Sequence, residues 1–207
     1  MEYSSLSNMS EYFQFILKHN RFTKCQSTES KKYLLVILLY YSIQFILFNE
    51  MAIIGKSTIH PILFYSGKIA GYIIWILYIL ALSGNDILNG SSHIYLLYTS
   101  YFITIVALLL ILLSSFGLGK SIRLGLPVEN TNLKTKGIYK FSRNPMYVGF
   151  NLLTISGMIY FLNATTFLLG LYSLLIYHFI ILGEERFLSN RFGERFRKYK
   201  MKTRRYV

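Results

Sequence analysis

The sequence has few charged residues and one cysteine, and each scarcity excludes a class of fold. Charged residues make up 15% of the 207 positions, while 53% are hydrophobic. About a quarter of the residues in a typical soluble domain are charged, so the composition excludes an ordinary cytosolic enzyme. Cys25 cannot form an internal disulfide, and no Cys/His pair recurs at metal-ligand spacing. Helix packing in lipid must therefore stabilise the fold.

Acidic residues are also scarce. The chain has 9 Asp and Glu against 22 Lys and Arg, a formal net charge of +13. Such a charge indicates a phosphate-rich partner or an anionic membrane surface. The long apolar runs and the 18 Tyr and 16 Phe favour the membrane, because aromatic rings settle at the depth of the lipid headgroups. We expect an anionic lipid surface as a partner and no nucleic acid.

Long apolar runs predict the membrane spans, because roughly 20 helical residues cross the hydrocarbon core. Three runs occupy residues 33–54, 59–82 and 94–118. A fourth, 146–182, is too long for one span and contains polar residues within 161–165 that permit a turn. It is interpreted as two helices. The second run is the least regular of the five spans, because Gly67, Lys68 and Gly71 interrupt it.

The predicted fold is an all-α integral membrane protein with about five transmembrane helices, a C-terminal helical hairpin and a cytosolic amphipathic helix. Residues 1–32 form a polar or interfacial N-terminal segment, and residues 33–118 hold three transmembrane helices. Residues 119–207 hold a polar loop, the hairpin and the amphipathic helix.

The distribution of Lys and Arg predicts the orientation. Residues 119–145 contain six of these cations and residues 183–207 contain nine, whereas the loop 83–93 contains none. The positive-inside rule places the first two segments in the cytoplasm, of either a bacterial inner membrane or the endoplasmic reticulum. Five spans then put the N-terminal segment outside, although it carries five cations of its own. Either the count is wrong by one or the C-terminal bias dominates.

Beyond the last span, apolar side chains at helical spacing predict one amphipathic helix: Leu188, Phe192, Phe196 and Tyr199. It is either a membrane-surface anchor or a lid over a cytosolic site, and both interpretations can hold together.

Ionisable residues at the edge of the last span are candidate site residues. His178 and Glu185 are seven residues apart and share a helix face. Glu184 and Glu185 are adjacent and project about 100° apart, so one can face inward and the other solvent. One interpretation is that the histidine is a packing residue and the two glutamates are solvated. The other is that these residues belong to a ligand site, in which a glutamate carboxylate accepts hydrogen bonds from ribose hydroxyls.

The segment 137–149, GIYKFSRNPMYVG, is the densest cluster of candidate residues. Pro145 suits the first turn of a helix, whose free N–H groups favour an anion. Arg143 lies beside that helix start, and together they could fix a carboxylate or phosphate. The alternative is a basic cytosolic loop followed by a helix-starting proline.

Three motifs in this order resemble the isoprenylcysteine carboxyl methyltransferase family. The first is the 137–149 segment, the second is Glu184-Glu185 with Leu188, and the third is Phe192-Gly193-Glu194 with Phe196 and Tyr199. The resemblance covers about the last 90 residues of this sequence. The first three spans match it only in general character.

The resemblance implies an integral membrane methyltransferase that uses S-adenosylmethionine and methylates a lipophilic acceptor entering from the bilayer, with the active site facing the cytoplasm. The acceptor most like the family is an isoprenylcysteine-type carboxylate, and related branches methylate phospholipid amines or small thiols. Arg143 would then orient the cofactor or the acceptor, and Glu185 and His178 would contact the acceptor. The cofactor-binding residues implied are Asn132, Leu133, Tyr139, Asn144, Pro145, Met146, Tyr147 and Glu184.

Two positions depart from the family pattern. Asn144 stands where the family usually has histidine, and an amide cannot take up a proton near neutral pH. Ile180 stands where the eukaryotic prenylcysteine enzymes have a substrate-binding arginine. An amine or thiol acceptor needs a general base, for which His178 and the two glutamates are candidates.

Two other classes of function stay open at this point. A membrane reductase of the sterol or enone type shares the glycine and aromatic pattern after the last span and would bind NADPH. A non-enzymatic membrane protein, such as a small transporter or an assembly subunit, is the third possibility, although no clear internal repeat is visible.

Overall fold

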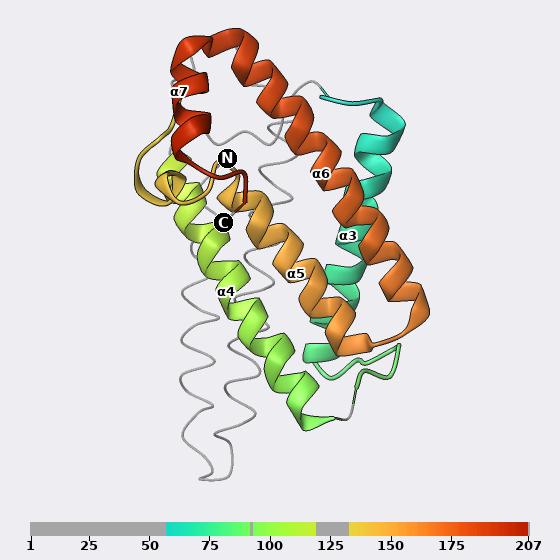
Figure 1. Ribbon diagram of the computed structural model, residues 1–207. Helices are drawn as coiled ribbons and strands as arrows, with labels where there is room; N and C mark the ends of the chain where they lie inside the picture. The colour runs from blue at the N-terminus through green and yellow to red at the C-terminus, as the bar shows by residue number, and fades with distance from the viewer. Residues whose placement is uncertain (1–56, 92, 119–132, 207) are drawn as a thin grey trace, which may run out of the picture. The chain divides into compact units, whose positions relative to one another are not determined.

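The computed structural model describes residues 57–91, 93–118 and 133–206 (Figure 1). They belong to one compact unit, and the described residues form helices with no strands. The helices are α3 (Pro61–Leu82), α4 (Ile94–Leu118), the 3-10 helix η2 (Gly137–Lys140), α5 (Pro145–Phe161), α6 (Ala164–Phe192) and α7 (Glu194–Lys202). The prediction of an all-α membrane fold is confirmed. The segment 1–32 and the first predicted span, 33–54, lie outside the described residues.

Three of the described helices are long and apolar enough to cross a membrane by length and composition: α3, residues Ile94–Gly117 of α4, and α6. Helix α5 has 17 residues, which is short for a span. The count of five spans and the hairpin as a membrane-crossing unit stay predictions.

Helix α3 is continuous through Gly67, Lys68 and Gly71, the residues that make its sequence irregular. A Cβ added at Gly67 would lie 2.3 Å from Cγ2 of Ile176, so the glycine allows α3 and α6 to approach closely. The side chain of Lys68 is 4% exposed, and its Nζ lies 4.3 Å from the centroid of the Phe64 ring. This cation–π contact offsets part of the cost of placing an ammonium within an apolar helix.

Helices α4 and α5 pack closely through a small residue and buried hydroxyls. A Cβ at Gly149 would lie 2.9 Å from the backbone oxygen of Ala107. Deeper in the interface, the hydroxyls of Thr104 and Ser156 lie 2.5 Å apart, and both side chains are fully buried. Small and hydroxyl-bearing residues of this kind hold helices together in lipid, where packing and hydrogen bonds replace the hydrophobic driving force.

The turn between α5 and α6 lies within the interval predicted for it. Leu162 adopts a left-handed conformation (φ +44°) after the last residue of α5. Asn163 then caps α6, its side-chain oxygen accepting a 2.9 Å hydrogen bond from the backbone N–H of Thr166.

The prediction of one amphipathic helix after the last span is wrong in one respect. Gly193 has φ +52°, which ends α6 at Phe192 and starts α7 at Glu194. A left-handed φ is accessible to glycine without strain, so the chain turns there. Phe196 and Tyr199 of α7 are buried, as their spacing predicted.

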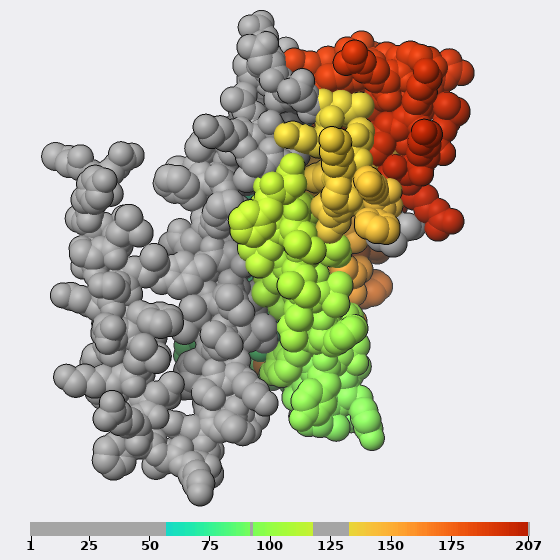
Figure 2. Space-filling model, turned by 90° about the vertical axis from the view of Figure 1, so that its left-hand side faces the viewer, coloured from blue at the N-terminus to red at the C-terminus, as the bar shows by residue number. Residues whose placement is uncertain are grey.

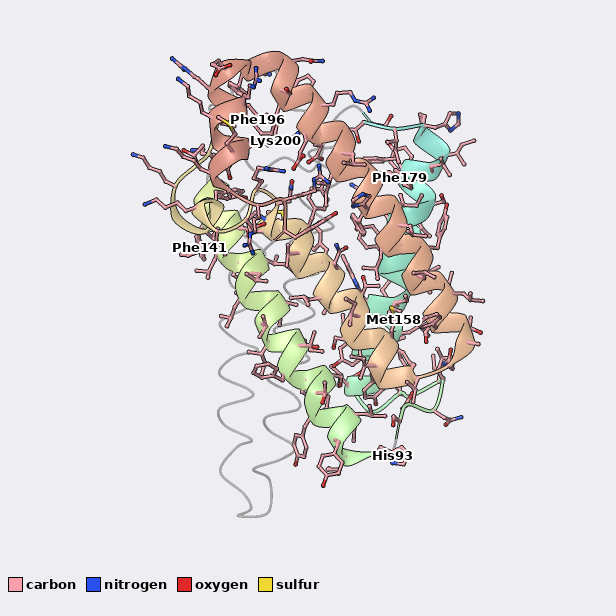
Figure 3. The ribbon with its side chains drawn as sticks, viewed as in Figure 1. His93, Phe141, Met158, Phe179, Phe196 and Lys200 are labelled. Atoms are coloured by element: carbon pink, nitrogen blue, oxygen red, sulfur yellow. The ribbon has the colours of Figure 1, made fainter. Side chains whose placement is uncertain are left out.

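The two ends of this helical body differ in composition. Phe196 and Lys200 of α7 lie at the same end as Phe141, and His93 lies at the opposite end (Figure 3). We call the first the α7 end and the second the far end. The start of α5 and the later part of α6 meet at the α7 end (Figure 1). The candidate residues of segment 137–149 and of Glu184-Glu185 are therefore brought to one end.

Candidate active site

The start of α5 is shaped by the residues just before it. Pro145 occupies the first position of the helix, as predicted, with Asn144 as the N-cap residue. The backbone N–H of Asn144 donates to Oγ of Ser142 over 3.1 Å. Asn144, Pro145, Met146 and Tyr147 are all buried, so this helix start is packed inside the protein.

The guanidinium of Arg143 donates through all three of its nitrogens. Its Nε lies 3.0 Å and its Nη2 2.9 Å from Oε1 of Glu185. Its Nη1 donates to the backbone oxygens of Lys200 over 3.1 Å and of Thr203 over 2.8 Å. The side chain is 7% exposed. Arg143 thereby connects the start of α5 to α6 and to the end of α7.

Glu185 is the centre of an ionic cluster. Its Oε1 also accepts from Nδ2 of Asn144 over 3.3 Å. Its Oε2 accepts from Nε and Nη2 of Arg205 over 3.2 and 3.0 Å. The Glu185 side chain is 6% exposed, and a buried carboxylate is tolerable only when it is paired in this way. Both of its oxygens therefore accept from protein donors.

Glu184 projects to a different side of α6 and is half-buried. Its Oε1 accepts a 2.6 Å hydrogen bond from the hydroxyl of Tyr147. The Tyr147 ring packs against Tyr177 of α6, with centroids 5.8 Å apart, and is 5% exposed. The two adjacent glutamates therefore serve different partners, as their 100° separation on a helix predicted.

Tyr139 lies in η2 with its hydroxyl 3.4 Å from the backbone oxygen of Ser114 in α4. Its own backbone oxygen accepts a 2.6 Å hydrogen bond from the hydroxyl of Tyr199 in α7. Burial raises the pKa of Tyr139 well above its ordinary value, and burial also raises the pKa of Tyr199 to about 12. Both phenols are neutral hydrogen-bond donors at neutral pH and do not act as bases there.

The loop 133–143 and α7 lie together at the α7 end in the space-filling view (Figure 2). Leu133 is half-buried at the start of this loop. Asn132 lies outside the described residues, so its predicted cofactor contact stays a prediction. The other predicted cofactor residues all lie in η2, at the start of α5 or at Glu184, and the fold brings these elements together.

His178 faces a residue that the sequence analysis missed. Its Nδ1 lies 2.5 Å from the hydroxyl of Tyr206, and the two rings stack with centroids 6.1 Å apart. Burial raises the pKa of the Tyr206 phenol, so the phenol is protonated at neutral pH.

Arg205 is the other residue that sequence reasoning missed. Nine cations follow residue 183, and no local pattern distinguishes the one that turns inward from its exposed neighbour Arg204. The useful signal is the end of α7 at Lys202, because the chain beyond it can fold back on the body.

Comparison with known families indicates the class of enzyme. Residues 100–195 match the family model of the phospholipid methyltransferases. The match begins within α4, at residue 100, includes η2, α5 and α6, and reaches the first turn of α7. It covers a little under half of the chain. No curated protein and no solved structure matches.

The match confirms the predicted resemblance at the level of integral membrane methyltransferases that use S-adenosylmethionine. The chain is a membrane methyltransferase of this type. The reductase and the non-enzymatic alternatives therefore lose their support.

The residues at the α7 end fit a sulfonium cofactor by their chemistry. S-adenosylmethionine carries ribose hydroxyls and positive charge, and a carboxylate such as Glu184 accepts hydrogen bonds from hydroxyls and attracts cations. Tyr147 orients that carboxylate through a charge-assisted bond. When bound, this cofactor supplies an electrophilic methyl group.

Proposed function

We propose that the protein methylates the amine of a phospholipid headgroup, with the methyl donor held by Glu184, Tyr147 and the start of α5. The observation that supports an amine acceptor is the pairing of the Arg143 side chain. An acceptor carboxylate needs a cation, and the guanidinium of Arg143 is already bound to Glu185 and to two backbone oxygens. A cationic headgroup amine needs none and is attracted by acidic side chains.

The reaction makes one N–C bond and breaks one C–S bond for each methyl group transferred. An ammonium must first lose a proton to become a nucleophile, so a general base is required. Asn144 cannot supply one. We assign the proton to the imidazole of His178, whose Nδ1 lies 2.5 Å from the hydroxyl of Tyr206. The donor leaves as the neutral thioether S-adenosylhomocysteine.

The proposal places this site at the cytoplasmic face, with the acceptor lipid entering from the bilayer. Exposed cations on α7 support this orientation: Arg195, Arg197, Lys198, Lys200 and Lys202. Basic side chains beside a span favour the cytoplasm and bind anionic headgroups by about 1 kcal/mol each. The acyl chains of a lipid acceptor are stabilised in the bilayer by about 0.8 kcal/mol per buried methylene. Entry from the bilayer is therefore favoured over entry from water.

The test is methyl transfer from labelled S-adenosylmethionine by purified protein in vesicles. Phosphatidylethanolamine and its monomethyl derivative form one arm, and an S-farnesylated N-acetylcysteine and a long-chain thiol form the others. We expect label in the phospholipid fraction. Label confined to the farnesylated acid or to the thiol would replace the amine by that acceptor class.

Glu184→Gln tests the donor site in the same assay. We expect its KM for S-adenosylmethionine to rise about tenfold or more, the value of one charge-assisted hydrogen bond. Glu194→Gln is the matched control, because it removes the same charge from an exposed position in the first turn of α7. Equal KM values for the two variants would contradict the donor role of Glu184.

A further inference from the structure

Residues 203–206 leave α7 and run beside the segment that precedes α5. We call them the 203–206 segment. Ser142 and Arg204 form an isolated parallel β-bridge, and the backbone N–H of Arg143 donates to the oxygen of Arg204 over 2.9 Å. This segment lies beyond the residues that match the methyltransferase family.

Arg205 contacts both of the elements that carry the proposed donor site. Its backbone oxygen accepts from Oγ of Ser142 over 3.3 Å and from Nδ2 of Asn144 over 3.2 Å. Its guanidinium binds Oε2 of Glu185 through two nitrogens. One residue therefore joins the N-cap of α5 to the later part of α6.

These contacts lie one helical turn or less from Tyr147 and Glu184, the two side chains proposed to hold the methyl donor. Asn144 precedes Tyr147 by three residues, which places the two about one turn apart at the start of α5. Glu185 directly follows Glu184 on α6. The 2.6 Å hydrogen bond between Tyr147 and Glu184 forms only at one rotation of α6 about its own axis and at one position of α6 along that axis relative to α5. Arg205 restrains both, because its Nε and Nη2 converge on one oxygen of Glu185 in α6 while its backbone oxygen accepts from Asn144 at the start of α5.

The neighbouring residue extends the same attachment along α6. Tyr206 bonds to His178, about two turns before Glu185 on the same face. The 203–206 segment is thus held to α6 at two points and to the start of α5 at a third.

We propose that Arg205 is a positioning residue of the methyl-donor site, acting through Glu185 and Asn144 to hold Glu184 against Tyr147. The proposal rests on the donor role proposed for Glu184. Arg205 itself does not contact the reacting atoms. Its side chain is 30% exposed, so part of its face is accessible to water while its two bonds point inward.

The experiment compares Arg205→Gln with Arg204→Gln in the full chain, by calorimetric binding of S-adenosylmethionine in detergent. Both variants lose one positive charge at adjacent positions, but the Arg204 side chain is exposed. We expect Arg205→Gln to weaken binding about tenfold and Arg204→Gln to bind as the wild type does. Arg205→Lys keeps the charge but cannot donate from two nitrogens to Oε2 of Glu185, and we expect it to recover part of the affinity.

A kinetic comparison separates positioning from a folding defect. A positioning role raises KM for the donor and leaves kcat at saturating donor nearly unchanged in the folded fraction. A purely structural role lowers the yield and the unfolding temperature with KM unchanged. Unchanged affinity and KM in folded Arg205→Gln, or in Arg205→Lys if the former does not fold, would overturn the proposal.

Glu184→Gln, measured alongside, separates this proposal from the proposed function. If Glu184→Gln weakens binding and Arg205→Gln does not, the positioning role fails and the donor role stands. If Glu184→Gln binds S-adenosylmethionine as the wild type does, Glu184 has no donor role. The positioning role of Arg205 then fails as well, because it is defined by its effect on Glu184.

Discussion

Helix α5 carries a tyrosine near each end, and each donates a hydrogen bond to a carboxylate on another element. At the α7 end, Tyr147 donates to Glu184 over 2.6 Å. At the far end, Tyr160 donates to Oδ2 of Asp86 over 3.3 Å. The second carboxylate also accepts from the backbone N–H of Gly90 over 2.7 Å, so it closes the 83–93 loop.

The difference lies in what surrounds each pair. Glu184 is followed by Glu185, which is bound by Arg143 and Arg205, and four separate segments meet there: the residues before α5, the end of α6, α7 and residues 203–206. The far-end pair joins one loop to one helix, and no Lys or Arg occurs in that loop. A tyrosine–carboxylate pair alone is therefore no sign of a site. The arginines that fix the backbone around it distinguish the two ends.

The largest expected difference between the ends is in stability. Glu185→Gln leaves Arg143 buried without its carboxylate, and we expect the free energy of unfolding to fall by about 3 kcal/mol, as when one partner of a buried pair is removed. Asp86→Asn keeps a hydrogen-bond acceptor in the 83–93 loop, so its loss should be about 1 kcal/mol. Thermal unfolding in detergent measures both. Equal losses would mean that the ionic cluster contributes no more than an ordinary loop contact.

The next difference is in donor binding. Tyr147→Phe removes the hydroxyl that orients Glu184, and we expect affinity for S-adenosylmethionine to fall about tenfold, since a hydrogen bond to a charged group contributes about 1.5 kcal/mol. Tyr160→Phe removes the equivalent bond at the far end and should bind the donor like the wild type. Calorimetry on the two variants gives the comparison directly. A weaker donor affinity in Tyr160→Phe would show that both ends contribute to the site.

The smallest expected effect concerns alkaline pH. The pKa of Tyr199 is raised to about 12, with burial as the main cause, so the folded state favours the protonated phenol. Its contribution to stability is fully present below pH about 10, the unfolded pKa, and is lost as the pH rises through about 12. We therefore expect the wild type to lose more stability than Tyr199→Phe between these values, in unfolding curves recorded at several pH values. Parallel pH profiles for the two proteins would contradict the shift.

Much of the fold followed from apolar runs. The ranges 59–82 and 94–118 correspond to α3 and α4, and the break expected within 161–165 lies between Phe161 and Ala164. The irregularity at Lys68 did not interrupt α3, because packing against α6 and the Phe64 ring offset it. The single amphipathic helix was not found, because the left-handed conformation of Gly193 depends on where α7 packs.

The candidate site was predicted in part. The sequence indicated the segment 137–149 and the Glu184-Glu185 pair, and its order and spacing indicated the family. It did not indicate which glutamate faces inward, nor that Arg143 is bound to Glu185. It gave no sign of Arg205 or Tyr206, since their partners are distant along the chain.

What the sequence by itself determined is therefore the medium, the helices and the class of chemistry. Apolar periodicity and the scarcity of charge are properties of local composition, and they require helices in lipid whatever the packing. What only the tertiary structure decided is the assignment of the charges. Whether a glutamate at the edge of a span serves a ligand or an arginine depends on which donors the fold places within about 3 Å of it. Here those donors come from residues 143, 144 and 205, which are brought together only when α5, α6 and α7 pack.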